Sequence, residues 1–319
     1  MLEVEIDVFS GMPNPKFELT EKEEQQLLDR ILSDTSQMSP VADPKTNFGL
    51  GYRGIIVRQT KSDTGPWEKV KGKKDLSIAS ELAAPQGSLP LEFRLGVHSA
   101  KGESADDWLL KIMERKRLPI SDEVLESLQP GVKLLAAVPK EAERPPEAEA
   151  ARADAEKELA VPKGATWWAC GSAYYNANHA LFNRPEYVTR NNCYCFASNH
   201  LANVRYALPG RRGGHPATSI TCTGVIQGLR ADGWVDGCQS NTLTIALVIW
   251  PGVDYHFYRV VSGGPDWWWE HKPGGTPARW TDNSGRPLYR GLSPVNCNRG
   301  NYIHFCGYFY QNNSTAFVA

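Results

Sequence analysis

Residues 191–206 of the chain read NNCYCFASNHLANVRY, and this stretch decides how the second half folds. Asn192 is a good helix N-cap, because its side-chain oxygen can accept from the open backbone N–H groups of a first turn. Apolar residues follow at i, i+4 and i+7 from Ala197, and Pro209 would end the helix. We therefore expect a helix that begins at Cys193 and carries this thiol at its N-terminus.

A thiol at a helix N-terminus is placed for nucleophilic chemistry. The free N–H groups and the positive end of the helix dipole favour an anion there. For Cys193 this predicts a lowered pKa and more thiolate at neutral pH. Cys195 lies two positions further on and could be the nucleophile instead. The other interpretation of Cys193 is half of a disulfide or a small buried hydrophobic residue.

Composition bounds the classes of protein that remain. The 319 residues suffice for two domains of ordinary size. Lys plus Arg number 35 and Asp plus Glu 36, so a net charge of −1 gives no general attraction to nucleic acid or anionic membranes. No apolar run approaches the ~20 residues that span a bilayer. Residues 1–8 alternate charged and apolar side chains, and we expect no secretory signal peptide.

The first part of the chain, residues 1–138, predicts a small α+β domain. Residues 4–8 alternate apolar and acidic side chains, which is typical of a half-buried strand. Thr20 and Glu23 form a capping box, so a helix should follow. This domain carries no catalytic set, which favours a delivery or partner-binding role. Further strands are expected at 54–57 and 91–95, and further helices at 104–116 and 121–128.

A linker is predicted at residues 139–163, because Ala, Glu and Pro dominate there and cannot bury a core. The second domain, residues 164–319, contains all seven cysteines. A helix and then an antiparallel sheet indicate an α+β domain. The second domain is expected to have a helix at 223–231 and strands at 242–249, 255–261, 266–272 and 302–310.

Two histidines are predicted to meet in a hairpin of this sheet. With a turn centred between Gly263 and Gly264, His256 stands opposite His271 on the same face of the sheet. Two imidazoles so placed can hydrogen-bond, one as a base and the other fixing its tautomer. A bulge would shift the register by one and bring Glu270 to that face. The alternative is that the two histidines are unrelated strand residues.

The order of a Cys at a helix start, a His on a strand and a polar residue on the next strand resembles the papain-like cysteine peptidase superfamily. The run ALVIWPG at residues 246–252, followed by His256, is similar to the strand and turn before the histidine of CHAP and NlpC-type cell-wall amidohydrolases. The resemblance covers about residues 191–272. It implies a papain-like helix packed on an antiparallel sheet. Asn192, Tyr194 and the second thiol Cys195 depart from the usual flanks of the nucleophile.

The resemblance implies acyl transfer from an amide. His256 would take the proton of Cys193, the thiolate would attack the carbonyl carbon, and His271 would orient His256. The backbone N–H of Cys193 would stabilise the oxyanion. Secondary candidates for the oxyanion and orienting roles are Asn191, Asn192, Asp282 and Asn283.

The function expected from this resemblance is a cysteine amidase or peptidase, exported as a toxin effector and acting on peptidoglycan peptides. It would be cytoplasmic in the producing cell and then leave by a route without a signal peptide. A peptide or cell-wall substrate, an immunity protein and secretion machinery are its expected partners. Two alternatives remain: a non-catalytic, disulfide-stapled module that binds glycan or peptide, and a protein deamidase or transglutaminase-like toxin.

Metal and disulfide chemistry follow from the cysteines. Zinc could take Cys193, Cys195, His179 and His200, but Cys-x-Cys lacks the usual ligand spacing. No Gly-rich loop has the phosphate-binding pattern, and we expect neither a metal nor a cofactor. Seven cysteines allow three disulfides and one free thiol, which would indicate an oxidising compartment. Pairing the cysteines that close short loops predicts Cys222 with Cys238 and Cys297 with Cys306, which leaves Cys170 with Cys195.

Overall fold

The computed structural model describes residues 1–46, 48–60, 90–98, 104–116, 118, 120–128, 179–239, 242–262, 268–289 and 291–319. The chain divides into two compact units. The first contains Met1–Val8, Asn14–Thr46 and Gly51–Pro139, and the second contains Phe9–Pro13, Asn47–Leu50 and Lys140–Ala319. Two short segments of the first fifty residues therefore belong to the second unit. The predicted linker at 139–163 lies outside the described residues.

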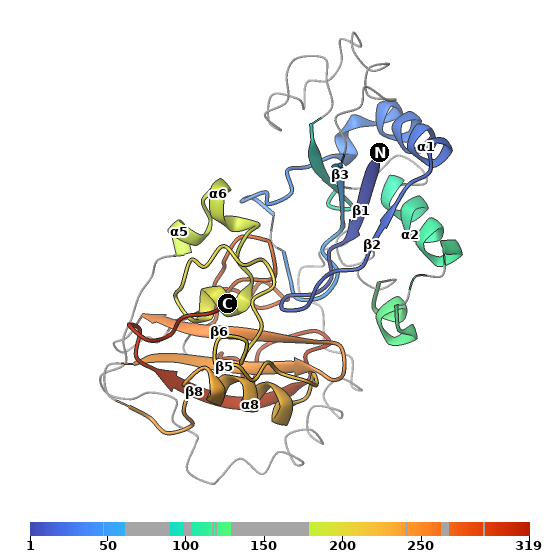
Figure 1. Ribbon diagram of the computed structural model, residues 1–319. Coiled ribbons are helices and arrows are strands. Elements are labelled where there is room, and N and C mark those ends of the chain that lie inside the picture. The colour runs from blue at the N-terminus through green and yellow to red at the C-terminus, as the bar shows by residue number, and fades with distance from the viewer. Residues whose placement is uncertain are drawn as a thin grey trace. The chain divides into compact units, whose positions relative to one another are not determined.

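The first unit is a four-stranded antiparallel sheet with helices (Figure 1). Thr20 and Glu23 form the predicted capping box, in which each side chain accepts from the other residue's backbone N–H. Leu27, Leu28 and Ile31 are the buried stripe of the helix that follows. The sheet order is β2 (Lys16–Glu18), β1 (Leu2–Ile6), β3 (Ile55–Gln59), β4 (Glu92–Leu95); the helices are α1 (Glu21–Ser33), η1 (Thr35–Gln37), α2 (Ala105–Lys116) and one at 122–128.

The second unit is also built on a four-stranded antiparallel sheet, so the α+β class is confirmed. The helix α7 packs against β6, and α8 packs against β5 and β8 (Figure 1). No helix in the described part of the chain is long and apolar enough to cross a membrane. The sheet order is β7 (Trp268–His271), β6 (Asp254–Ser262), β5 (Leu243–Trp250), β8 (His304–Gln311); the helices are α5 (His179–Phe182), α6 (Pro185–Val188), α7 (Cys193–Ala197) and α8 (Cys222–Ala231).

The helix α7 begins where predicted but is much shorter. The Asn192 side chain caps it by accepting from Cys195 N at 3.2 Å. It ends at Ala197, because Asn199 adopts a left-handed conformation with φ of 52° and the His200 N–H turns back to Cys195 O. Asparagine tolerates this conformation better than most residues. The predicted continuation of the helix to residue 204 is therefore wrong.

The register of the β6–β7 hairpin differs from the prediction by two positions. His271 stands opposite Tyr258, and Glu270 stands opposite Arg259. The register shifts between Val260 and Ser262, as in a β-bulge. Side chains alternate with a period of two, so a slip of two positions keeps the same residues on the same face. The predicted turn at Gly263 and Gly264 lies outside the described residues.

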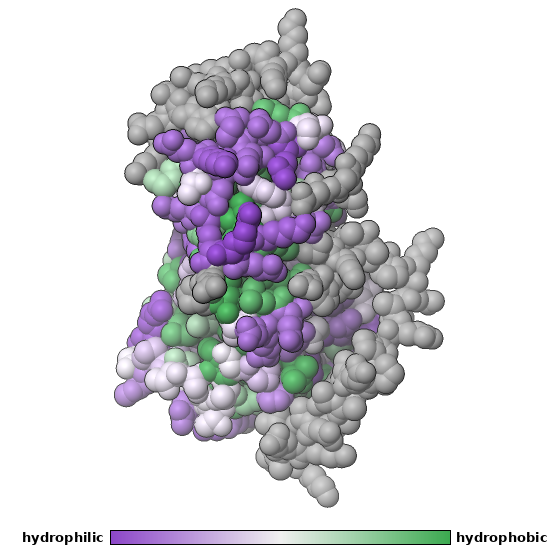
Figure 2. All heavy atoms as spheres, turned by 90° about the vertical axis from the view of Figure 1, so that its right-hand side faces the viewer, coloured by the Kyte–Doolittle hydropathy of each residue, from purple (hydrophilic) through white to green (hydrophobic). Residues whose placement is uncertain are grey.

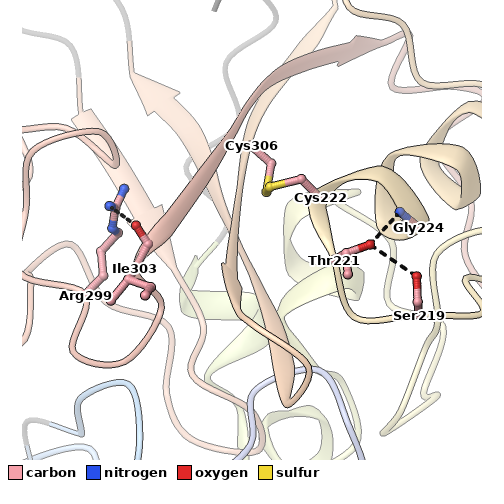
Figure 3. The surroundings of a disulfide bond; sticks show 7 residues. All are labelled: Ser219, Thr221, Cys222, Gly224, Arg299, Ile303 and Cys306. Atoms are coloured by element: carbon pink, nitrogen blue, oxygen red, sulfur yellow. Dashed lines mark hydrogen bonds between the residues drawn. A yellow bond between two sulfur atoms is a disulfide. The ribbon is translucent and has the colours of Figure 1, made fainter. Parts of the chain in front are cut away.

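One disulfide is described in full, and it is not one of the predicted pairs. Cys222 at the start of α8 is bonded to Cys306 on β8, with a Cα–Cα distance of 5.3 Å (Figure 3). Cys193, Cys195 and Cys297 are reduced thiols, and all three are buried. The predicted pairs Cys222–Cys238, Cys297–Cys306 and Cys170–Cys195 are therefore wrong. Short sequence separation was a poor guide, because the bonded pair is 84 residues apart.

Candidate functional site

The candidate nucleophile Cys193 lies in the core of the second unit. Its side chain is fully buried, and its Sγ is 3.9 Å from the backbone O of Tyr255. Burial, followed by the charge of Asp254, raises the pKa of this thiol well above its usual value. The lowered pKa expected from the helix N-terminus is therefore wrong. A five-residue helix offers few aligned peptide dipoles, and desolvation of the thiolate outweighs them.

Cys193 and His256 face opposite sides of the sheet. Cys193 belongs to the same apolar cluster as Tyr255 and Phe257 of β6. Successive strand residues point to opposite faces, so His256, between these two, points the other way. Its ring contacts Tyr258 and Tyr302. We call the Cys193 side the thiol face and the His256 side the histidine face. By this alternation, the side chains of Cys193 and His256 lie on opposite sides of β6.

The two histidines do meet on the histidine face. His256 Nε2 lies 2.8 Å from His271 Nδ1, and His271 Nε2 lies 2.9 Å from the backbone O of Thr281. A carbonyl oxygen only accepts, so His271 must carry its proton on Nε2 and accept at Nδ1 from His256. Burial, followed by the charge of Arg279, lowers the pKa of His271 to about 3, so this ring is neutral near neutral pH. The predicted contact on one face is confirmed, although the two residues are diagonal rather than opposite.

Other members of the histidine face were missed from the sequence. Asp254 is two residues before His256 and accepts from the backbone N–H groups of Gly11 at 3.1 Å and Met12 at 2.8 Å, and also from Ser10. The Tyr302 hydroxyl donates to the same carboxylate. Burial raises the pKa of Asp254 to about 6. The alternation of Asp254, His256 and Tyr258 indicates that they share one face of a strand. Nothing in the sequence pointed to the distant residues that contact them.

Cys297 also lies on the histidine face. Its Sγ is 3.9 Å from the Tyr258 hydroxyl, and Tyr258 stacks on His271 with ring centroids 4.6 Å apart. Burial raises the pKa of Tyr258 well above its usual value. From the sequence, we predict a disulfide between Cys297 and Cys306. In the structure Cys297 is a reduced thiol that is connected to His271 through Tyr258.

The secondary candidates hold loops in place. The Asn191 amide donates to Tyr187 O at 3.0 Å and accepts from Asn203 N at 3.0 Å. The Asn192 amide donates to Ala207 O at 2.9 Å. Both amides are therefore engaged in hydrogen bonds to backbone groups of neighbouring loops.

Asn283 and Asp282 also hold backbone. Asn283 brackets Leu50, accepting from its N–H at 2.8 Å and donating to its O at 3.0 Å. Asp282 accepts from the backbone N–H groups of Arg286 and Asn298 and forms an ion pair with the Arg286 guanidinium at 2.8 Å. Neither side chain touches the histidine pair through these contacts. Both stabilise the segment that follows β7.

The proposed zinc ligands are spread over separate contacts. His179 Nδ1 lies 3.0 Å from Glu270 Oε1, whereas His200 Nδ1 accepts from the backbone N–H of Val318 at 3.1 Å. Within the described ranges, no group of three or more His, Cys, Asp or Glu side chains is placed to hold a metal ion.

Comparison with known proteins gives one relationship. No family model matches the chain, and no solved structure matches it. The chain is 40% identical over 127 residues to insoluble matrix shell protein 1 of Ruditapes philippinarum. The match covers 37% of this chain and 78% of that protein.

Proposed function

The chain belongs to the family of insoluble matrix shell protein 1 of Ruditapes philippinarum, and from this relationship we propose that it is a non-catalytic, disulfide-stapled binding module of an extracellular matrix. The relative is by name a matrix protein of a shell. A matrix protein acts by holding other components, so its fold has to persist outside the cell. The proposal extends beyond the 37% of this chain that the relative matches.

The observation that carries the proposal is the separation of Cys193 from the histidine pair. A thiol nucleophile needs its base within hydrogen-bond reach. Here the sheet lies between the thiol and His256, since Tyr255 and Phe257 share the cluster of Cys193 while His256 alternates to the other face. The raised pKa of Cys193 also leaves little thiolate at neutral pH. Each of these features works against nucleophilic catalysis.

The disulfide supports the same proposal. Cys222–Cys306 ties α8 to β8 across 84 residues of sequence. Disulfides persist in oxidising compartments, which is where an extracellular matrix lies. Closing a loop of this length removes unfolded-state entropy equivalent to about 4–5 kcal/mol in the chain-entropy model. The second unit therefore carries a cross-link suited to a protein that is not renewed inside a cell.

A cysteine amidase or peptidase acting on peptidoglycan peptides is the second candidate. One observation favours it: His256 and His271 are 2.8 Å apart, as a base and its orienting partner would be. This candidate requires Cys193 to leave the core and reach the histidine face. A deamidase or transglutaminase-like activity would need the same rearrangement.

Turnover assays separate the two candidates. The full chain would be incubated with peptidoglycan and with a glutamine-rich protein, and released amines and fragments followed by mass spectrometry. We expect no product above the buffer blank. Matched variants are Cys193→Ala on the thiol face and Cys297→Ala on the histidine face. Turnover that either variant abolishes would overturn the proposal and establish a cysteine enzyme.

Thiol labelling gives an independent measurement of the same point. Cys193 and Cys195 are fully buried, and burial raises the pKa of Cys195 to about 11. We expect iodoacetamide at pH 7.5 to modify neither thiol in the native protein and both after unfolding. Fast, selective native labelling of Cys193 would show a reactive thiolate and would contradict the proposal.

A further inference from the structure

Three aromatic rings gather at β7 of the second unit. Trp268 of β7 and Tyr289 stack with ring planes 2° apart and centroids 4.4 Å apart. Trp280 lies beside Trp268, with centroids 4.8 Å apart. We call these three residues the aromatic surface. Their rings form a contiguous apolar area rather than isolated side chains.

The aromatic surface is open to solvent. Trp280 is 42% exposed, and Trp268 and Tyr289 are partly exposed. Among the described residues, Leu91 and Phe317 are the other large hydrophobic side chains with such exposure. The face drawn in Figure 2 shows hydrophobic side chains in patches among hydrophilic ones. Single exposed apolar residues need no explanation, whereas contiguous exposed apolar areas mark interaction sites.

A carboxylate with a vacant oxygen lies on the same side of β7. Glu270 is two residues after Trp268 and therefore shares its face. Its side chain is only 7% exposed, and Oε1 lies 3.0 Å from Nδ1 of His179. Its second oxygen, Oε2, is buried and has no hydrogen-bond partner within the described part of the chain. A buried acceptor without a donor costs about 1–3 kcal/mol, so an incoming donor would be favourable here.

The backbone brings this carboxylate next to the exposed ring. His271 and Arg279 form an antiparallel bridge through two backbone hydrogen bonds of 2.8 Å each. In such a bridge, the residue before one partner lies next to the residue after the other. Glu270 and Trp280 are those residues. Glu270 and Trp280 are therefore neighbours across this bridge, and opposed residues of a bridge share one face.

We propose that the aromatic surface stacks against pyranose rings of a neutral polysaccharide, while Glu270 accepts a hydrogen bond from a hydroxyl or amide N–H of the same sugar. A pyranose ring presents C–H groups on its faces, which pack on aromatic rings, and donors around its rim. Sites of this kind combine aromatic walls with a few placed polar groups. This inference rests on the proposed binding function and names its ligand class.

The surrounding charges favour a neutral ligand. His179 stands beside Glu270, and Arg259 stands opposite it in the β6–β7 register. The hydrogen bond between His179 and Glu270 raises the pKa of His179, so this imidazole stays positively charged to higher pH. The carboxylate charge is thus already compensated by the protein. What remains unsatisfied is an acceptor lone pair, which needs a donor and not a cation.

Depletion onto insoluble polysaccharides tests the proposal with the full chain. Chitin and microcrystalline cellulose are the probes, because they differ in the acetamido group. Trp280→Ala removes the exposed ring, and Phe317→Ala is the matched control, since Phe317 is 40% exposed outside the aromatic surface. We expect Trp280→Ala to weaken binding about tenfold or more and Phe317→Ala to change it less than about twofold. Trp280→Tyr should recover most of the affinity.

The Glu270→Gln variant tests the acceptor. A charge-assisted hydrogen bond is about twice as strong as a neutral one, so we expect a loss of about fivefold to tenfold. Near-ultraviolet circular dichroism checks that each variant is folded. Failure of the wild type to bind either probe, equal losses in Trp280→Ala and Phe317→Ala, or binding of a Pro-rich peptide instead would each overturn the inference. If neither probe binds and no enzymatic turnover is found, the matrix proposal still stands. Enzymatic turnover overturns the matrix proposal, whichever probe binds.

Discussion

The two faces of the second sheet are equally buried but are held together differently. On the thiol face, Cys193, Tyr255 and Phe257 pack in an apolar cluster, and the Tyr255 hydroxyl also donates to Ala207 O at 2.6 Å. On the histidine face, Asp254 and His256 are also fully buried, yet both take part in hydrogen bonds. Apolar packing is non-directional and tolerates similar shapes. A hydrogen-bonded face fails when one partner is removed, because the other is left buried and unsatisfied.

The largest effect should come from removing the donors that Asp254 requires. A fragment of residues 164–319 lacks the segment Phe9–Pro13, which belongs to the second unit. The Asp254 carboxylate would then lose the backbone N–H groups of Ser10, Gly11 and Met12. We expect this fragment to lack a cooperative thermal transition by circular dichroism.

The full chain cut once between residues 139 and 163 is the matched control. It retains residues 9–13 and should stay folded, because the hydrogen bonds to Asp254 are all present. A fragment of 164–319 that melts like the full chain would show that the two faces do not differ as described.

A single substitution at Asp254 should have the next largest effect. Asp254→Ala leaves the Tyr302 hydroxyl and three backbone N–H groups without their acceptor. We expect a loss of about 3–5 kcal/mol in the free energy of unfolding, measured in urea with the full chain. Phe257→Leu on the thiol face is the comparison and should cost less than about 1.5 kcal/mol. Equal losses would remove the distinction between the faces.

Acid should weaken the histidine face in a defined range of pH. The pKa of His271 is about 3 in the folded protein because the ring is buried, against about 6.5 when exposed. At pH values between these two, the imidazole of His271 is protonated in the unfolded chain but not in the folded chain. The contribution of His271 to stability is therefore present above pH 6.5 and is lost as the pH falls toward 3. The loss amounts to roughly 3 kcal/mol by pH 4.

The variant His271→Gln isolates this contribution. The pH dependence of stability that Asp254 contributes has the opposite sign. Burial raises the pKa of Asp254 to about 6, so the stability that its proton provides is lost as the pH rises from about 4 to 6. Both chains keep Asp254, so it cancels in their difference. Wild type should lose more stability than His271→Gln between pH 7 and pH 4 in urea titrations. Equal slopes would show that His271 is not a buried neutral ring.

The smallest effect is expected outside both faces. Arg230 and Asp236 form an ion pair at 2.5 Å, and their side chains are 57% and 55% exposed. Solvent screens such pairs, so Asp236→Asn should change the free energy of unfolding by less than about 0.5 kcal/mol. The same urea titration measures it. A loss as large as that of Asp254→Ala would mean that carboxylate removal destabilises this unit regardless of burial.

Local chemistry explains what could be predicted from the sequence. The cap at Asn192, the capping box at Thr20 and the alternation in β6 depend on residues close in sequence. These features correctly placed the start of α7, the helix α1 and the two histidines on one face. The contact between His256 and His271 survived a register error because the slip was an even number of residues.

Long-range packing explains what could not be predicted. The face to which Cys193 turns depends on how α7 docks on β6, and no local pattern encodes it. The end of α7 depends on Asn199 taking a positive φ, which competes with a plausible helical stripe. The disulfide partner of Cys222 lies 84 residues away. The donors to Asp254 lie 242 to 244 residues away and belong to a turn with no visible function of its own.

That turn has a consequence for the order in which the chain can fold during synthesis. Ser10, Gly11 and Met12 are made 242 to 244 residues before their acceptor Asp254. At about 5–20 residues per second, these N–H groups wait roughly 12 to 50 s for their partner. The sheet of the first unit is complete by Leu95, well before then. The first unit can therefore form while the N–H groups of the turn at residues 9–13 still lack their acceptor, and the second unit can close only after Asp254 has been translated.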